Sequence, residues 1–243
     1  MNILKQEKSR RLCKDELIFW MVYAIMTICQ SERKMIMPIG SMERTNARKE
    51  EIINACEKLY QTMSFKEITL KEIGKETSFS RTSIYNYFQT KEEIFLALLK
   101  REYDQWIRQL DEVMESKANM TDDEIADTLA RTLDEHRQLL KIMSMNHYDL
   151  EENSRMELLV EFKVSYGNAL KTVMAMLAKF RKDMDGEKRK EFVYSFFPFM
   201  FGIYPYTVVT EKQREAMKQA GVDYTYSSLY DLTFTAAKRM LKS

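Results

Sequence analysis

A segment rich in hydrogen-bond donors follows Phe79. Between Ser80 and Phe88 the chain places one cation, several hydroxyl groups and an amide, with no acid among them: Arg81, Thr82, Ser83, Tyr85, Asn86 and Tyr87. Arginine can contact guanine through two hydrogen bonds, and short polar side chains can reach other base edges or phosphates. A short helix with such a face, braced by a preceding helix, suits the major groove of DNA. The predicted chemistry is therefore recognition rather than catalysis.

The surrounding residues predict the elements that hold this segment. Residues 69–93 indicate two short helices joined by a turn, followed by the start of a third helix. Thr69 with Glu72 and Thr90 with Glu93 have the spacing of capping boxes. Ser80 can cap the helix between them. The side chains expected to turn inward as a core are Leu70, Ile73, Phe79, Ile84 and Phe88.

From Arg44 to Arg101 the chain resembles the DNA-binding domain of TetR/AcrR-type repressors. At the positions of that family's pattern it has Thr69, Ile73, Phe79, Ser80, Ile84, Tyr85, Tyr87, Phe88, Lys91, Glu92 and Ile94. It departs from the pattern at Gly74, Thr77, Ser78 and Phe79, where Ala, Ala, Gly and Val are usual. The run SRTSIYNYFQTKEEI, placed after a helix and a turn, is a specific signal for the family.

The resemblance implies roles for individual residues. In the family the amino-terminal end of the first helix touches phosphate, although a solvated charge is the alternative for any one of its residues here. Tyrosines at the positions of Tyr85 and Tyr87 usually donate to phosphate, and packing against the first helix is the alternative for Tyr85. Lys91 begins a helix, where amides and the ammonium group both attract phosphate. The predicted DNA-binding residues are Arg44, Thr45, Arg48, Thr69, Lys71, Ser80, Arg81, Thr82, Ser83, Tyr85, Asn86, Tyr87 and Lys91.

Composition bounds the fold and the class of protein. Six glycines and three prolines in 243 residues argue against a turn-dense β fold and for long helices. The predicted fold is all-α, with a helix-turn-helix DNA-binding domain at 44–101 and a helical regulatory and dimerisation domain at 102–243. The net charge of +1 requires any basic surface to be local. Three cysteines without a close pair predict a reducing, cytoplasmic compartment and no metal site.

Residues 1–43 form an extension of uncertain status. The apolar run Leu17–Cys29 follows several basic residues, as in a signal peptide, but no small-residue cleavage site follows it. Thirteen helical residues also span only about 20 Å, short of a bilayer core of about 30 Å. The main interpretation is a start codon assigned too early, with Met35, Met37 or Met42 as the true start. The alternatives are an extra packed or interfacial helix and a membrane anchor.

The second half indicates further amphipathic helices. They are expected from Lys91 to about Met114, from Thr121 onward, briefly at 139–143, at about 154–180, at 192–209 and at 226–241, with a connecting turn at 145–153 and a solvated turn at 182–190. The stretch 192–209 is long enough to be weighed as a membrane span, but its tyrosines and prolines make it a poor one, and no membrane partner is expected.

Methionines and aromatic residues are plentiful, and such side chains line adaptable apolar pockets, although core packing is the simpler explanation for each residue. The candidate pocket residues are Tyr103, Trp106, Tyr166, Phe196, Phe199 and Tyr204. In the family the helix corresponding to 192–209 commonly contributes to the ligand pocket and the dimer interface. The candidate dimer residues, on the small-residue side of the last helix, are Leu229, Leu232, Thr233, Ala236, Ala237 and Met240. The expected partners are a palindromic operator in double-stranded DNA, a small-molecule effector and a second copy of the chain.

Catalysis is the rival from another class of function. The two histidines, His136 and His147, have no triad or metal-ligand spacing, and His136 is expected to be exposed on a helix. No phosphate-cradling glycine loop and no nucleophile elbow occur in the sequence. No catalytic residue, metal ligand or cofactor is therefore expected. A third interpretation is a helical protein that keeps this fold and uses its first domain for protein contacts.

Overall fold

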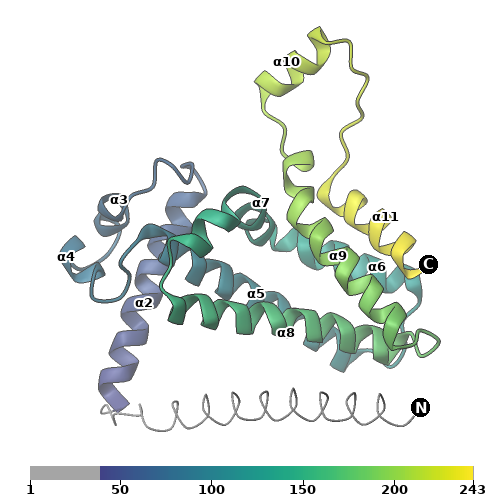
Figure 1. Cartoon of the computed structure of the whole chain (residues 1–243), viewed down its shortest axis with the longest axis horizontal. Helices are drawn as coiled ribbons and strands as arrows, with labels where there is room; N and C mark the ends of the chain where they lie inside the picture. The colour runs from purple at the N-terminus through teal and green to yellow at the C-terminus, as the bar shows by residue number, and fades with distance from the viewer. Residues whose placement is uncertain (1–38, 243) are drawn as a thin grey trace, which may run out of the picture. The chain divides into compact units, whose positions relative to one another are not determined.

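The structure, a computed structural model, describes residues 39–242, and every regular element among them is an α-helix (Figure 1). The helices are α2 (Ile39–Tyr60), α3 (Leu70–Lys75), α4 (Arg81–Ile84), α5 (Lys91–Ser116), α6 (Asp122–Glu135), α7 (Arg137–Glu152), α8 (Met156–Phe180), α9 (Gly186–Thr207), α10 (Glu211–Gln219) and α11 (Leu229–Leu241). The all-α prediction is confirmed. The chain from Glu50 onward forms one compact unit, and residues up to Lys49 belong to another. The expectations for residues 1–38, including the apolar run Leu17–Cys29, lie outside the described residues.

Helix α5 is central to the larger unit. Along its length Phe95, Leu99, Tyr103, Trp106 and Leu110 are all buried. It packs along α8 and also contacts α6 and α7, and Figure 1 shows α5 and α8 side by side. Helix α11 packs on α6, while α9 lies against α7, α8 and α11. Because α5 runs unbroken through residue 101, the domain boundary at that residue stays a prediction.

The capping signals locate the helix starts correctly. The Thr121 hydroxyl accepts from the Glu124 amide, and the Glu124 carboxylate accepts from the Thr121 amide at 2.8 Å, so α6 starts with a complete capping box. Thr69 and Thr90 likewise accept from the amides of Glu72 and Glu93, at 3.3 Å and 3.2 Å. At those two sites the carboxylate does not complete the box, and at Glu93 it has another partner.

Three predicted boundaries were wrong. The connecting turn expected at 145–153 is helical, because α7 continues through Glu152 and buries Leu150 together with Leu139 and Met143. Helix α9 starts at Gly186, within the expected solvated turn, where the Asp185 carboxylate accepts from the Lys188 amide at 2.9 Å. Helix α11 starts only at Leu229, after the cap Ser228.

His136 lies at the junction of α6 and α7 and is not the exposed helix residue that the sequence predicts. Its Nδ1 is 3.2 Å from Oε2 of the buried Glu102 on α5. Gln138 donates to both Glu102 and Glu57, at 3.3 Å and 3.2 Å. Arg101 also contacts Glu57, at 2.6 Å. These polar contacts join the end of α2 to α5 and α7 and give His136 a structural partner in Glu102.

Helix α9 contains Pro198 and Pro205, and both prolines are exposed. Its inward side is apolar and buries Phe192, Phe196 and Met200. Among the described residues, no single helix is long and apolar enough to cross a membrane; α9 and α10 meet the length and composition test only together, with a bend of 83° between them.

Helix α10 interrupts the path from α9 to α11, and Figure 1 shows it at the end of a projecting segment. We call residues 208–228 the α10 arm. Thr210 and Gln213 form a complete capping box at its start. At its end Gly221 has a φ of 65°, and the Val222 amide donates to the Met217 carbonyl at 3.0 Å, as in a Schellman motif. The helix nevertheless has no buried residue. Its ends are specified locally, while its apolar side has little to pack against.

Candidate nucleic-acid interface

Helices α3 and α4 form the predicted pair with a tight turn between them. Ile73, Ile84 and Phe88 are buried beneath them, while Leu70 and Phe79 are partly buried against the same core. Helix α4 comes so close to α3 that a Cβ atom added to Gly74 would lie 3.3 Å from Arg81 Cα. A methyl group at this position would require Arg81 to move by a few tenths of an ångström.

We call residues 80–88 the reading segment. It is less regular than the single helix expected from Ser80 to Phe88. Helix α4 ends at Ile84. The chain then continues in tight turns, with the Asn86 amide donating to Ser83 and the Tyr87 amide to Ile84, at 3.2 Å and 2.8 Å. Ser80 does not cap the helix through its side chain; its hydroxyl lies 3.1 Å from that of Ser83. Short i to i+3 turns therefore present the donors after Ile84.

The predicted donors lie on the outer side of this segment. Arg81, Thr82, Tyr85 and Asn86 are exposed, and Ser83 is partly exposed. Arg81 Nη2 donates to the Tyr85 hydroxyl at 3.1 Å, and its guanidinium lies 5.9 Å from the centre of that ring. The alternative for Tyr85, burial against the first helix, does not hold, because the ring is exposed. The surface can donate hydrogen bonds without an acid to repel phosphate.

Other predicted DNA contacts have partners within the protein. Lys91 Nζ donates to the Phe65 carbonyl at 2.7 Å and lies 4.1 Å from the centre of the Phe65 ring. The Thr69 hydroxyl contacts the Glu72 carboxylate. Tyr87 is partly buried, with its ring 6.4 Å from that of Phe79. Lys91 would have to leave Phe65 to reach a phosphate, whereas Lys71 is exposed.

The three candidates in the smaller unit lie in the first part of α2. Arg44 and Arg48 are exposed, and Thr45 is partly buried. All three belong to the unit that ends at Lys49, whereas α3 and α4 belong to the larger unit. Their phosphate contacts stay a prediction.

Sequence reasoning missed a clamp at the end of the reading segment. The Glu93 carboxylate, 1% exposed, accepts from Arg155 Nε at 2.6 Å and from the amides of Gln89 and Arg155 at 2.7 Å and 3.1 Å. Arg155 Nη2 also donates to the Tyr87 carbonyl at 3.1 Å. Nearby, the Thr90 hydroxyl donates to the Asn153 carbonyl at 3.0 Å. The corner between α7 and α8 is thus fastened to the residues that follow α4.

The electrostatics of the clamp favour a charged pair. Burial alone raises the pKa of Glu93, but hydrogen bonds from Arg155 and from the Gln89 amide outweigh it, so the pKa of this carboxyl is lowered. The hydrogen bond to Glu93 raises the pKa of the Arg155 guanidinium. The only sequence signal for this carboxylate was the spacing of Thr90 and Glu93. That spacing predicted a capping box with Thr90 rather than an ion pair with Arg155.

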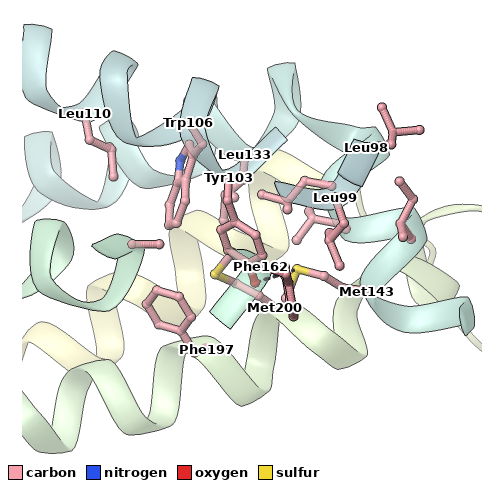
Figure 2. Close-up of a cluster of buried hydrophobic side chains, with 14 of the residues drawn as sticks. Leu98, Leu99, Tyr103, Trp106, Leu110, Leu133, Met143, Phe162, Phe197 and Met200 are labelled. Carbon is pink, nitrogen blue, oxygen red and sulfur yellow. Dashed lines mark hydrogen bonds between the residues drawn. The ribbon is translucent and has the colours of Figure 1, made fainter. Parts of the chain in front are cut away.

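Two candidate pocket residues, Tyr103 and Trp106, lie in a cluster of buried side chains that includes Phe162 and Phe197 (Figure 2). The Tyr103 ring is 5.8 Å from Tyr166, which is 5.7 Å from Phe197, and Phe197 is 6.1 Å from Trp106. Phe197 and Phe162 were not predicted to belong to this set. The Tyr103 hydroxyl donates to Met143 Sδ at 3.2 Å, and burial raises the pKa of Tyr103 well above its ordinary value.

Phe196 adjoins the cluster, with its ring 6.5 Å from that of Phe197. Phe196 stacks near Phe199 with 6.2 Å between the ring centres, and Tyr204 is partly buried. Burial also raises the pKa of Tyr166 and of Tyr204. The assignment of these residues to a ligand pocket stays a prediction.

An open cavity of about 480 Å³ lies elsewhere, under α10. None of the candidate pocket residues lines it. Its walls are Pro205, Tyr206, Val209, Gln213, Ala216, Met217, Ala220, Tyr224 and Tyr226. Sequence reasoning missed this site because it did not identify α10, although Thr210, Gln213 and Gly221 carry the signals of a capped helix.

The dimer candidates on α11 divide into two groups. Leu229, Thr233 and Ala237 are buried within the protomer, on the helix that packs against α6, and cannot reach a partner. The prediction is corrected for these three, because the small-residue side of α11 faces its own chain. Leu232, Ala236 and Met240 are partly exposed. Their role at an interface stays a prediction.

The described residues contain no group of three or more histidine, cysteine or acidic side chains that could hold a metal ion. Cys56 is buried and free, and burial raises the pKa of its thiol. The thiol is therefore protonated and packed as a small hydrophobic group.

Comparison with known families gives two matches that together cover most of the described chain. The family described as "Bacterial regulatory proteins, tetR family" matches residues 52–98, and the family described as "Tetracyclin repressor-like, C-terminal domain" matches residues 100–231. A curated relative, the uncharacterized HTH-type transcriptional regulator YfiR of Bacillus subtilis (strain 168), is 30% identical over 81 residues. That match covers 33% of this chain and 40% of the relative, less than half the length of either.

Solved structures show the same fold at low identity. The fatty acid degradation regulator FadR from Bacillus halodurans has a TM-score of 0.51 and 15% identity, over 80% of this chain and 94% of that one. A TetR-family regulator from Mesorhizobium loti has a TM-score of 0.54 and 15% identity, over 82% and 97% of the two chains. FadR from Bacillus subtilis, solved in complex with stearoyl-CoA, has a TM-score of 0.50 and 17% identity, over 79% and 96%.

Proposed function

The chain belongs to the TetR family of transcriptional regulators, and from that premise we propose that it is a repressor that binds a palindromic operator as a homodimer. A small, largely apolar molecule releases it from the operator. The observation that carries the proposal is the exposed, acid-free donor surface of Arg81, Thr82, Tyr85 and Asn86, mounted on the buried anchors beneath α4. That surface has the chemistry of groove and phosphate contact.

A homodimer follows from the size of the reading segment. Helix α4 and its turn can contact only a few bases, whereas two copies related by a two-fold axis read both halves of a palindrome. The exposed side of α9, with Tyr194 and Tyr206, supports the proposal because it offers apolar surface to a second copy. Leu232, Ala236 and Met240 on α11 are candidates for the same interface.

The aromatic cluster supports an apolar effector. Met143 and Met200 lie among its rings (Figure 2), and thioether side chains adapt their shape readily. The Tyr103 hydroxyl has a sulfur atom as its partner, a weak acceptor that a ligand oxygen could replace. An effector that forces α5 and α8 apart would also strain the Glu93–Arg155 clamp, because Glu93 lies on α5 and Arg155 immediately precedes α8. Binding and release would then be linked as two states of one dimer.

The test is a mobility shift with DNA from directly upstream of the chain's own gene, over a salt series. We expect a specific, salt-sensitive shift.

Arg81→Ala should weaken the free energy of binding to a preferred sequence by about 1–3 kcal/mol and relax the sequence preference. Tyr87→Phe should weaken binding to all sequences similarly if the hydroxyl holds phosphate. Arg131→Ala, an exposed arginine on α6, is the matched control and should bind like the parent.

Two results would separate this proposal from the alternative of a protein-contact module. Folded dimer that shifts neither this fragment nor a pool of random genomic DNA would overturn the repressor. An Arg81→Ala variant with parental affinity and preference would remove α4 as the reading element even if the chain binds DNA. Release of a bound fragment on addition of an apolar compound would identify the effector class.

A further inference from the structure

The α10 arm is an element whose ends are specified but whose packing is incomplete. A helix of nine residues is too short to be stable in water without tertiary contacts. Its capping box and its Schellman motif define where it starts and ends, yet none of its residues is buried. Val208 and Val222, in the two connecting segments that flank the helix, are also exposed. The arm therefore has apolar side chains that the rest of its own protomer leaves exposed.

The cavity under α10 shows what that partner must be like. Its lining is almost entirely apolar and aromatic and includes no charged side chain. Gln213, the most polar residue of the lining, is already used in the capping box with Thr210. Tyr224 and Tyr226 form an edge-to-face pair, with 5.0 Å between their ring centres, on one wall. An apolar occupant fits this lining better than a charged one, which would find no counter-ion among the lining residues.

A second surface of the same chain is also apolar and exposed. Met156, Val160 and Val164 recur every four residues on α8 and are 68%, 44% and 58% exposed. Side chains at this spacing lie one above the other and form a ridge on the helix. We call these three residues the α8 ridge. Its large apolar side chains on the surface mark a site of contact.

We propose that the α10 arm clasps a second copy of this chain, with the cavity under α10 receiving the α8 ridge of the partner. A two-fold axis makes the contact twice, since each arm meets the other copy's ridge. A small molecule in the cavity would leave the ridge uncovered and Val208 and Val222 in water, whereas a second copy covers both surfaces. The inference goes beyond the proposed function but presupposes its homodimer.

The first test measures the dimer dissociation constant by sedimentation equilibrium without DNA, using the full chain. Met217→Asp in the cavity wall and Val164→Asp on the ridge should each weaken the dimer by about 30-fold, as expected for buried contacts at the centre of an interface. Gln219→Asp, on the exposed side of α10, and Ala178→Asp, about 21 Å farther along α8, are the matched controls. Both controls should stay within about two-fold of the parent.

A second test does not depend on destabilising the arm. A chain with Met217→Cys and Val160→Cys, in a background with Cys13→Ser and Cys29→Ser, should form a covalent dimer on mild oxidation. Either substitution alone should not, and neither should Met217→Cys combined with Lys190→Cys. The native Cys56 can stay because it is buried.

The outcomes distinguish this proposal from the proposed function. A parent chain that is monomeric at micromolar concentration overturns the homodimer and the clasp together. A tight dimer that neither aspartate variant weakens, and that gives no cross-link, overturns the clasp alone. If Met217→Asp instead abolishes binding of an apolar dye while the dimer stays intact, the cavity is a small-molecule site and the proposal is wrong.

Discussion

Replacing Arg155 with methionine should lower the free energy of unfolding by about 3 kcal/mol, because it leaves the buried carboxylate of Glu93 without its counter-ion. This is the lower end of the range for broken buried pairs. The Arg155 side chain is 40% exposed, so its removal lets water reach the carboxylate. The melting temperature should fall by about 6–12 °C. Calorimetry at neutral pH and fixed protomer concentration would measure both quantities.

Two further variants make this result specific. Arg137→Met removes an exposed arginine that pairs with Asp134 on the surface, and it should leave stability nearly unchanged. Adding Glu93→Gln to Arg155→Met should recover part of the loss, because a neutral amide tolerates burial better and its oxygen can still accept from the Gln89 amide. A double variant that is less stable than Arg155→Met alone would contradict the assignment of the loss to an unpaired charge.

The same pair sets a dependence on pH. The pKa of Glu93 is lowered in the folded chain, so its contribution to stability is complete above the ordinary pKa of 4.5 and is lost as the pH falls through the lower, folded value. In Arg155→Met only burial and the remaining amides act on the carboxyl, and burial raises its pKa. Protonation then relieves the variant, so the difference in stability between parent and variant should narrow on acidification.

Loss of the clamp should also reach the DNA surface. Arg155 holds the Tyr87 carbonyl directly, and Asn153 accepts from Thr90 just beyond it. Without the Arg155 side chain, the Tyr87 carbonyl loses its contact with the corner between α7 and α8, and the Thr90–Asn153 hydrogen bond remains. If the proposed repressor mechanism holds, operator affinity in Arg155→Met should fall even where the protein remains folded.

Truncating Trp106 to alanine should cost about 3–5 kcal/mol, as large-to-small changes in well-packed cores do. The side chain is fully buried, its ring is 6.1 Å from Phe197, and its indole N–H donates to the Thr132 hydroxyl at 2.9 Å. Alanine would leave a cavity between α5 and α9 and remove the Thr132 partner. Urea unfolding followed by circular dichroism would give the free energy.

Trp106→Phe separates the two contributions. It keeps most of the apolar contact and removes the hydrogen bond, so a smaller loss of about 1–2 kcal/mol is expected. Tyr148→Ala, at a ring that is 87% exposed, is the control and should change little. Equal losses in Trp106→Ala and Trp106→Phe would mean that the hydrogen bond, rather than the packing, dominates at this site.

Local signals predicted much of the fold. Thr69, Thr90 and Thr121 start helices where their spacing from a glutamate indicates, because a capping hydroxyl acts within one turn of chain. Burial of Ile73, Ile84 and Phe88 also followed from spacing alone, since helical periodicity decides which side chains share a face. The same periodicity predicted that the hydrogen-bond donors of α4 are exposed.

Contacts between distant segments could not be predicted in the same way. The sequence predicted that the Glu93 carboxylate completes a capping box with Thr90. In the structure this carboxylate pairs with the guanidinium of Arg155, 62 positions away. Lys91 looked free for phosphate but is held by Phe65. The small residues of α11 indicated close helix packing correctly, but the sequence could not say whether the neighbouring helix belonged to the same chain. Leu229, Thr233 and Ala237 are buried within the same protomer, where α11 packs on α6 and α9.

The weakly packed α10 also determines where the folded chain is open to cleavage. Local opening costs least where few apolar contacts must be broken, so proteases attack such segments first. Lys212, Arg214 and Lys218 place tryptic sites within the nine residues of α10. A cut there leaves α11 packed on α6, so the two fragments should stay associated after nicking. If the α8 ridge of a second copy covers the arm, the dimer would resist this cleavage. A protomer without a partner would then be degraded faster than an assembled one.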